Sequence, residues 1–131
     1  MASEESYPDD LRYHPEHDWA RVDGAEAVLG ITWYAQDALG ELVHFEAPEV
    51  GAAVTKDGAY AEVESVKAVS DVVAPLSGEV LEVNQKALDE PETINADPYG
   101  EGWLVRIALS APGEVESLLE PEAYRAHVAD Q

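Results

Sequence analysis

Cysteine is absent from the 131 residues of this chain. A disulfide framework, a thiolate nucleophile and a cysteine-ligated metal or cluster are therefore excluded. Basic residues are scarce, because 7 Lys and Arg stand against 28 Asp and Glu, which gives a formal net charge of -21. Nucleic-acid phosphates require clustered Lys and Arg, so we expect no nucleic-acid partner. No apolar run approaches the roughly 18 residues of a membrane span, so we expect no membrane partner either.

Hydrophobic residues make up 46% of the chain, which is too many for a disordered acidic protein. Residues 1–11 predict a flexible acidic arm, and residues 12–131 predict one domain with helices at its C-terminal end. The arm begins with Met and has no apolar leader, so we expect a prokaryotic protein in the cytoplasm. Repulsion between acidic surfaces favours a monomer. The acidic excess itself has three open interpretations: solubility, adaptation to high salt, and attraction to basic partners.

Alternating apolar residues in short runs, separated by turn residues, predict a mainly β fold, either a sandwich or a barrel. Asp23-Gly24 is a strong signal for a hairpin turn between the first two runs. The expected strands cover residues 19–22, 25–29, 42–46, 53–54, 59–63, 68–73, 79–83 and 103–109.

Short helices are expected near the N-terminal third and at the C-terminus. They cover residues 33–39, one turn at 86–89 within a mostly loop-like stretch over 84–102, a segment at 115–119, and 121–128. Thr32 and Gly40 are suited to cap the first helix at its two ends. Val115, Leu118 and Leu119 have the spacing of one helical face, which predicts the third.

Motifs of catalytic chemistry are missing from the sequence. It contains no Gly-x-Ser-x-Gly nucleophile turn, phosphate loop or dinucleotide fingerprint. His14 and His17 resemble a metal-binding pair, but Pro15 between them opposes the regular helix that would bring their rings together. We therefore expect no metal site there, and we expect the three Trp residues to serve packing.

Lys67 is conspicuous in a chain with three lysines. It sits in a Ser-Val-Lys-Ala turn between two segments of strand pattern, so its amine would project from a hairpin tip. A projecting amine is a good acyl acceptor when deprotonated, and Glu64 and Asp71 would give an attaching enzyme charged handles. The turn alone favours the more common case, an ordinary solvated lysine.

Six separated blocks along the chain extend this pattern, at residues 13–19, 30–40, 64–71, 75–84, 94–104 and 118–124. They include Tyr13-His-Pro-Glu-His-Asp-Trp19 and Glu64-Ser-Val-Lys-Ala68. In this order and spacing they resemble the glycine cleavage system H proteins. The resemblance covers residues 12–128, nearly the whole chain.

The resemblance implies a lipoyl/biotinyl-type β-sandwich, also described as a barrel-sandwich hybrid or hammerhead. It implies a non-catalytic carrier with lipoate attached to Lys67. Such a carrier takes an aminomethyl group from the pyridoxal-phosphate enzyme glycine decarboxylase to the tetrahydrofolate-dependent aminomethyltransferase, and dihydrolipoyl dehydrogenase then reoxidises the dithiol. One-carbon metabolism and glycine catabolism are the processes this role serves.

The resemblance also implies roles for four further residues. Glu64, three residues before the lysine, and Gly78, eleven after it, would help the lipoate-attaching enzyme to recognise the hairpin. Asp18 and Asp71 are candidates for a surface cleft that receives the loaded arm, where a carboxylate would pair with its ammonium. Asp18 is one methylene shorter than the Glu often found at that position.

Four other classes of protein remain open as alternatives to an H protein. A biotinyl carrier usually has Met on both sides of its lysine, whereas Val66 and Ala68 flank Lys67. A lipoyl domain of a 2-oxo acid dehydrogenase usually has Asp before the lysine and belongs to a longer chain. An H-like protein that donates lipoate to other proteins would have the same motifs. The fourth alternative is an acidic interaction domain without modification.

Overall fold

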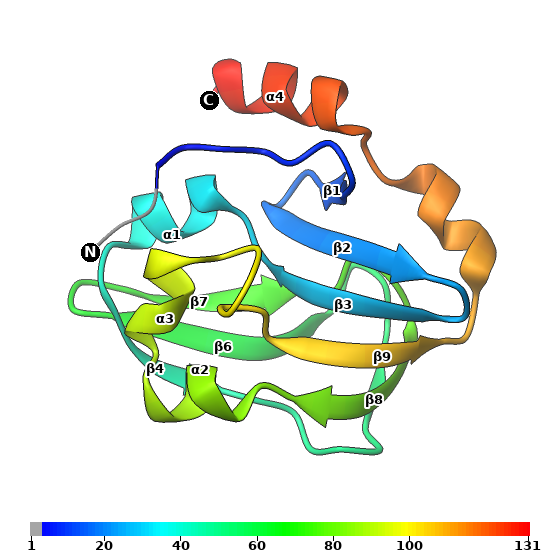
Figure 1. Cartoon of the computed structure of the whole chain (residues 1–131), viewed down its shortest axis with the longest axis horizontal. Helices are drawn as coiled ribbons and strands as arrows, with labels where there is room; N and C mark the ends of the chain where they lie inside the picture. Colours follow the sequence, from blue (N-terminus) through cyan, green and yellow to red (C-terminus); the bar gives the residue numbers. More distant parts are fainter. Residues whose placement is uncertain (1–3) are drawn as a thin grey trace.

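Two antiparallel sheets form the molecule (Figure 1). The structure, a computed structural model, describes residues 4–131, and residues 1–3 of the predicted arm lie outside the described residues. The six-stranded sheet contains, in spatial order, β1 (Arg12–His14), β2 (Asp18–Asp23), β3 (Glu26–Ile31), β9 (Val105–Leu109), β8 (Gly78–Val83) and β5 (Ala53–Val54). The three-stranded sheet contains β4 (Leu42–Glu46), β6 (Ala59–Ser65) and β7 (Val69–Val73).

The main hydrophobic core unites the two sheets. Leu29 and Ile107 of the larger sheet join Phe45, Val63 and Val72 of the smaller sheet in one buried cluster. Burying a side chain of this size contributes about 1.5–3 kcal/mol, so the apolar half of each alternating strand holds the sandwich together. The predicted mainly β sandwich is confirmed.

The first helix, α1 (Trp33–Leu39), has the predicted bounds and caps. The Thr32 side chain accepts a hydrogen bond from the Ala35 N–H, and the Gly40 N–H donates to the Gln36 carbonyl. Gly40 has a φ of 86°, in the left-handed region that favours glycine. The hairpin turn at Asp23-Gly24 is confirmed as well, with a φ of 63° at Gly24.

The stretch over residues 84–102 contains two helices, α2 (Gln85–Asp89) and α3 (Glu92–Ala96). The expectation of mostly loop was therefore wrong for α3. Pro91 stands at the helix N-cap, where its missing N–H is not needed. Burial of Ile94 and Asn95 fixes this short helix against the rest of the protein.

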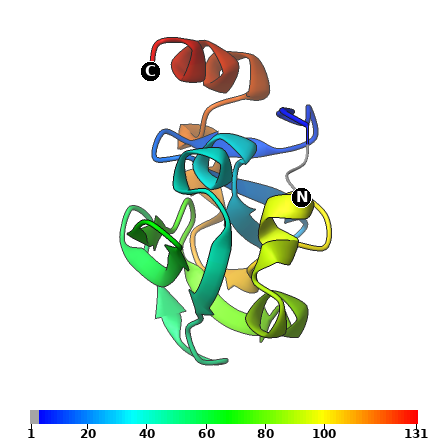
Figure 2. The same ribbon diagram turned by 90° about the vertical axis from the view of Figure 1, so that its left-hand side faces the viewer.

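The C-terminal segment contains a 3-10 turn, η1 (Pro112–Ser117), and then α4 (Pro121–Ala129). The predicted helical face of Val115, Leu118 and Leu119 was wrong. Tyr13 on the edge strand β1 exchanges two hydrogen bonds with Leu119, of 2.9 and 2.8 Å, which draws Leu119 into an extended conformation. Figures 1 and 2 place α4 at one end of the molecule, over β1 and away from β8. None of the helices that the structure describes is long and apolar enough to cross a membrane.

A second buried cluster, mostly aromatic, lies beneath α4. It consists of Leu11, Tyr13, Trp19, Tyr99 and Tyr124. The described part of the predicted arm, residues 4–11, runs along this cluster: the Tyr13 hydroxyl donates to the Pro8 carbonyl at 2.7 Å and the Tyr99 hydroxyl to the Ser6 carbonyl at 2.6 Å. Trp19 is fully buried, as its predicted packing role requires.

Candidate functional site

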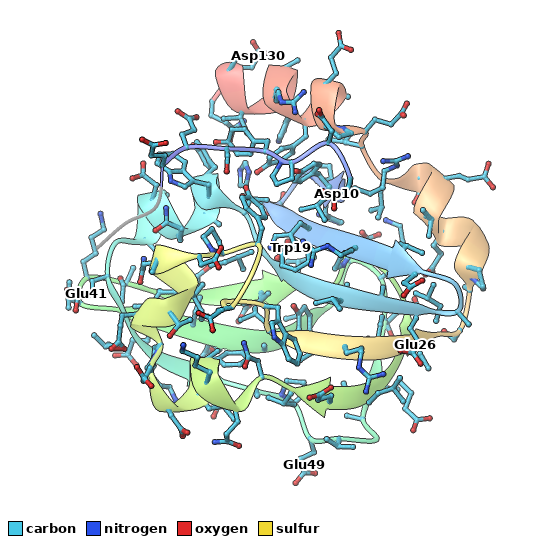
Figure 3. The ribbon with its side chains drawn as sticks, viewed as in Figure 1. Asp10, Trp19, Glu26, Glu41, Glu49 and Asp130 are labelled. Atoms are coloured by element: carbon cyan, nitrogen blue, oxygen red, sulfur yellow. The ribbon has the colours of Figure 1, made fainter. Side chains whose placement is uncertain are left out.

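Lys67 occupies the tip of the hairpin formed by β6 and β7. The turn between the two strands covers residues 66–68, and Lys67 is exposed there. This hairpin points outward at the left of Figure 1, and Figure 3 labels Glu41 near its tip. The predicted position of the lysine on a projecting turn is therefore what the structure contains.

Ser65 makes the turn rigid. Its hydroxyl oxygen is buried beneath the tip and accepts hydrogen bonds from the N–H groups of Lys67 at 3.2 Å and Ala68 at 3.1 Å. The Ser65 N–H donates to the Ala68 carbonyl at 2.8 Å. These bonds hold the lysine backbone without a glycine in the turn. The strand and turn pattern alone does not indicate the role of Ser65, although a Ser two residues before the lysine is the signal for it.

The corner between α1 and β4 supports the hairpin tip. The Val66 N–H donates to the Glu41 carbonyl at 3.3 Å. The lysine stem lies over Gly40, because a Cβ there would stand 3.6 Å from Lys67 Cε. Asn95 fixes this corner from α3: its amide donates to the Gly40 carbonyl at 2.9 Å and accepts from the Leu42 N–H at 2.9 Å.

Glu64 and Asp71 lie on the same side of the three-stranded sheet as exposed side chains. Glu64 stands directly opposite Val69, and Asp71 stands directly opposite Glu62. Directly opposed residues on neighbouring strands point to the same face. The structure therefore places these two predicted residues together, on the hairpin that presents Lys67.

Gly78 is placed elsewhere, in β8 of the six-stranded sheet, and it is buried. A Cβ there would stand 2.2 Å from the Ala108 carbonyl oxygen of β9 and 3.1 Å from Ile107 Cδ1. No side chain fits in that space, so close packing alone requires a glycine here.

Asp18 differs from the exposed hairpin residues because it is buried, with only 2% of it exposed. Burial raises its pKa well above the ordinary value of 3.8, although a hydrogen bond from the Val73 N–H opposes the shift. Among the described residues, Asp18 Oδ2 and Tyr60 Oη are buried without a hydrogen-bond partner. Burial raises the pKa of Tyr60 too, and the nearby Asp18 charge adds to that shift.

We expect Asp18→Asn to stabilise the protein at pH 7 by about 1–3 kcal/mol, because a neutral amide avoids the cost of burying a charged carboxylate with an unpartnered oxygen. The raised pKa of Asp18 means that the native state binds more protons than the unfolded state above pH 3.8, so this residue lowers stability as pH rises. The gain should therefore grow with pH. Urea unfolding of both proteins between pH 5 and 8 measures it, and Asp71→Asn is the exposed control. Parallel stability curves for Asp18→Asn and the wild type would contradict the assignment.

The two histidines of the metal-like motif have separate partners. His14 Nδ1 accepts the Glu16 N–H, so its Nε2 donates to Asp57 Oδ1 at 2.7 Å. The Nδ1 atom of His17 lies 2.8 Å from the Tyr124 hydroxyl. Within residues 4–131, no three His, Cys, Asp or Glu side chains gather as metal ligands.

Known proteins resemble this chain over nearly its whole length. A family model described as glycine cleavage H-protein matches residues 11–131. The glycine cleavage system H protein of Symbiobacterium thermophilum is 51% identical over 119 residues, which are 91% of this chain and 93% of that protein. The probable glycine cleavage system H protein of Haloarcula marismortui is 48% identical over 92% of this chain and 95% of its own length. The crystal structure of a glycine cleavage system H protein from Mycobacterium marinum matches with a TM-score of 0.86 and 41% identity, covering 93% of this chain and 98% of that one.

A two-sheet sandwich that presents one lysine on a stiff hairpin defines a carrier domain of the lipoyl type. Such a domain carries a group on its lysine and performs no chemistry on that group itself. The chain belongs to the glycine cleavage H-protein family. It is therefore a carrier subunit with covalently bound lipoate and not an enzyme, and the expectation from the resemblance is confirmed.

Proposed function

We propose that Lys67 bears the lipoyl group and that the protein serves the glycine cleavage system. The observation that carries this proposal is the exposed lysine on a turn that Ser65 holds rigid. In the attachment step, deprotonated Nζ attacks the carbonyl carbon of an activated lipoyl group. The amide bond forms as the activating group leaves, and Nζ loses a proton.

The rigid turn around Lys67 and the absence of cysteine are suited to a carrier with a long mobile arm. Bound lipoate supplies a disulfide that accepts the aminomethyl group at glycine decarboxylase and releases it at the aminomethyltransferase, before dihydrolipoyl dehydrogenase reoxidises the dithiol. A rigid base keeps the arm's free end at a high effective concentration near each enzyme. Since the chain has no cysteine, no thiol of its own can exchange with the arm's disulfide.

Asp71 and Asp18 differ in how accessible their carboxylates are to the loaded arm. Asp71 lines a shallow hollow of about 300 Å³ with Glu46 and Glu62, where an exposed carboxylate is available to the ammonium of the loaded arm. Asp18 is buried, with an unpartnered Oδ2 that would gain a donor if the arm's ammonium reached it. Both residues therefore remain candidates for the arm cleft, and Asp71 needs no opening of the structure.

The proposal retains a monomer in the cytoplasm of a prokaryote. Like charges on a surface with a net charge of -21 oppose self-association, which supports the monomer. A role as a lipoate donor to other proteins is the second candidate function, because it uses the same lysine on the same hairpin.

Two assays test the proposal in sequence. Intact mass after incubation with lipoate and a lipoate-attaching enzyme should rise by one lipoyl group, and peptide mapping should place it on Lys67. The loaded protein should then support glycine-dependent release of carbon dioxide by glycine decarboxylase. Loading without this release, accompanied by lipoyl transfer to other apo-proteins, would favour the donor role.

We expect Glu64→Ala to lower kcat/KM for lipoylation about five- to tenfold, the loss of one charge-assisted contact. Glu64 is exposed and forms no ion pair with the described residues, so its removal should change the free energy of unfolding by about 0.5 kcal/mol or less. Rates of lipoylation and thermal melts measure both effects. Glu79→Ala, an exposed strand glutamate of the other sheet, is the control. An unchanged lipoylation rate would remove Glu64 from the recognition set.

A further inference from the structure

Nearly all basic residues of the chain form ion pairs with acidic residues of the same chain. Of the 7 Lys and Arg residues, all except Lys67 form ion pairs with carboxylates of the described chain. These six are Arg12, Arg21, Lys56, Lys86, Arg106 and Arg125. None of them belongs to β4, β6 or β7. The three-stranded sheet is therefore left without a cation of its own, apart from Lys67 at its tip.

The outer face of this sheet carries two rows of side chains that cross its three strands. One row is His44, Glu64 and Val69, and the other is Glu46, Glu62 and Asp71. We call these six residues the outer sheet face. Its carboxylates form no ion pair within residues 4–131. Like charges directly opposite one another destabilise a sheet, so the second row lowers stability, and no ion pair among the described residues compensates for it.

Apolar side chains accompany these charges at the hairpin tip. Val66 is 74% exposed and Val69 is 58% exposed, on either side of Lys67. These two side chains offer a partner apolar contact area on both sides of the lysine. The outer sheet face thus has an apolar end at the lysine and an anionic row further along the same strands.

We propose that the outer sheet face is the docking surface for the enzyme that attaches lipoate to Lys67, through a Lys- and Arg-rich patch on that enzyme. The inference rests on the proposed function and adds the surface and its partner's chemistry. The attaching enzyme must bring its active site to Nζ itself, so it has to cover the strands that carry the lysine. Enzymes that act at the far end of the arm have the whole lipoyl group between their active sites and this face.

Charge complementarity selects this occupant over a second copy of the chain. Two outer sheet faces would bring four carboxylates from each copy together, which is repulsive. A cationic enzyme surface instead relieves the repulsion within the row and is attracted at long range. Acylation removes the charge of Lys67, so the loaded product differs from the substrate at the centre of the contact.

The first test removes two of the three charges of the anionic row, those of Glu46 and Glu62, and leaves Glu64 and Asp71 unchanged. We expect Glu46→Gln combined with Glu62→Gln to lower kcat/KM for lipoylation about tenfold in about 20 mM salt, with kcat nearly unchanged, because electrostatic attraction acts mainly on association. In about 0.5 M salt the difference should shrink to about twofold, since screening shortens the range of the attraction. The matched control is Glu79→Gln combined with Glu116→Gln, which removes the same charge from two exposed, unpaired sites elsewhere.

A second variant tests the apolar end. Val69→Ala should lower kcat/KM about threefold at both salt concentrations, because apolar contacts do not depend on screening. Thermal melts of all the variants identify any loss of folding. Each rate is compared with that of the wild type, whose modification at Lys67 is established separately by peptide mapping.

The outcomes separate this inference from the proposed function. A wild type that gains no lipoyl group at Lys67 would overturn the proposed function and this inference with it. Normal lipoylation of the wild type with equal rates for the row variant and its control would overturn the docking surface alone. Unchanged lipoylation with a salt-dependent loss of loading by glycine decarboxylase would assign the face to that enzyme instead. A wild-type dimer in sedimentation that the row variant abolishes would assign it to a second copy.

Discussion

Lys67→Ala should fold normally, gain no lipoyl group and give no glycine cleavage. Lys67 is exposed and forms no ion pair with the described residues, so its side chain contributes little to stability, about 0.5 kcal/mol or less. The other two lysines cannot replace it. Lys56 Nζ lies 3.2 Å from Asp57 Oδ1, and Lys86 Nζ lies 3.2 Å from Glu101 Oε1. Neither lysine is on the β6–β7 hairpin.

Intact mass after enzymatic lipoylation, thermal melting and reconstituted glycine cleavage measure these three expectations. Lys67→Arg keeps the positive charge and separates loss of the acyl acceptor from loss of charge, because a guanidinium stays protonated and is not acylated. Lys56→Ala is the control that should still be lipoylated. A lipoyl group found on Lys56 or Lys86 of the Lys67→Ala protein would contradict the assignment of the site.

Local signals in the sequence predicted much of the fold because the physics at those positions is local. Thr32 and Gly40 bound α1 as expected, since a side-chain cap and a positive φ require only neighbouring residues. The hairpin at Asp23-Gly24 follows from the same kind of signal. The short alternating runs predict a sandwich or a barrel, and the resemblance to the H proteins favours the sandwich.

The predictions of secondary structure were wrong where contacts between residues far apart in the sequence decide the conformation. Helix α3 depends on burial of Ile94 and Asn95, and Asn95 donates to Gln36 Oε1 at 3.0 Å across 59 residues of sequence. Leu119 is extended because Tyr13, over a hundred residues earlier, requires a partner for its edge strand. No window of a dozen residues contains such information, so the periodicity alone favoured a loop in one place and a helix in the other.

The candidate site likewise combines features that the local sequence predicts with features that depend on the folded structure. The turn pattern predicted the projecting Lys67, and the resemblance supplied its chemistry, but Ser65 and Gly40 acquire their roles only in three dimensions. The resemblance implies that Asp18 lines a surface cleft, whereas the structure buries it. Val73 of β7 and Tyr60 of β6 lie close to it, and no local pattern indicates these contacts.

Gly78→Ala should lower the free energy of unfolding by about 3 kcal/mol or more, the upper part of the range for overpacking. The new methyl group would stand 2.2 Å from the Ala108 carbonyl oxygen, which belongs to the backbone of β9 and cannot rotate away. Relief requires β8 and β9 to separate at the place where they pair. For a domain of this size the melting temperature should fall by roughly 10 °C.

This expectation distinguishes two explanations for the glycine. If packing alone requires Gly78, the fraction of the variant that is folded at low temperature should be lipoylated at the wild-type rate, because the residue is buried and no enzyme can contact it. If the attaching enzyme recognises it, the folded variant should be modified slowly. Gly113→Ala, where nothing lies within 4 Å of the new methyl group, is the control for both measurements. A normal melting temperature with slow lipoylation would return Gly78 to the recognition set. Loss of stability with a normal rate would show that a residue so close to the lysine in sequence acts only by keeping two strands of the other sheet together.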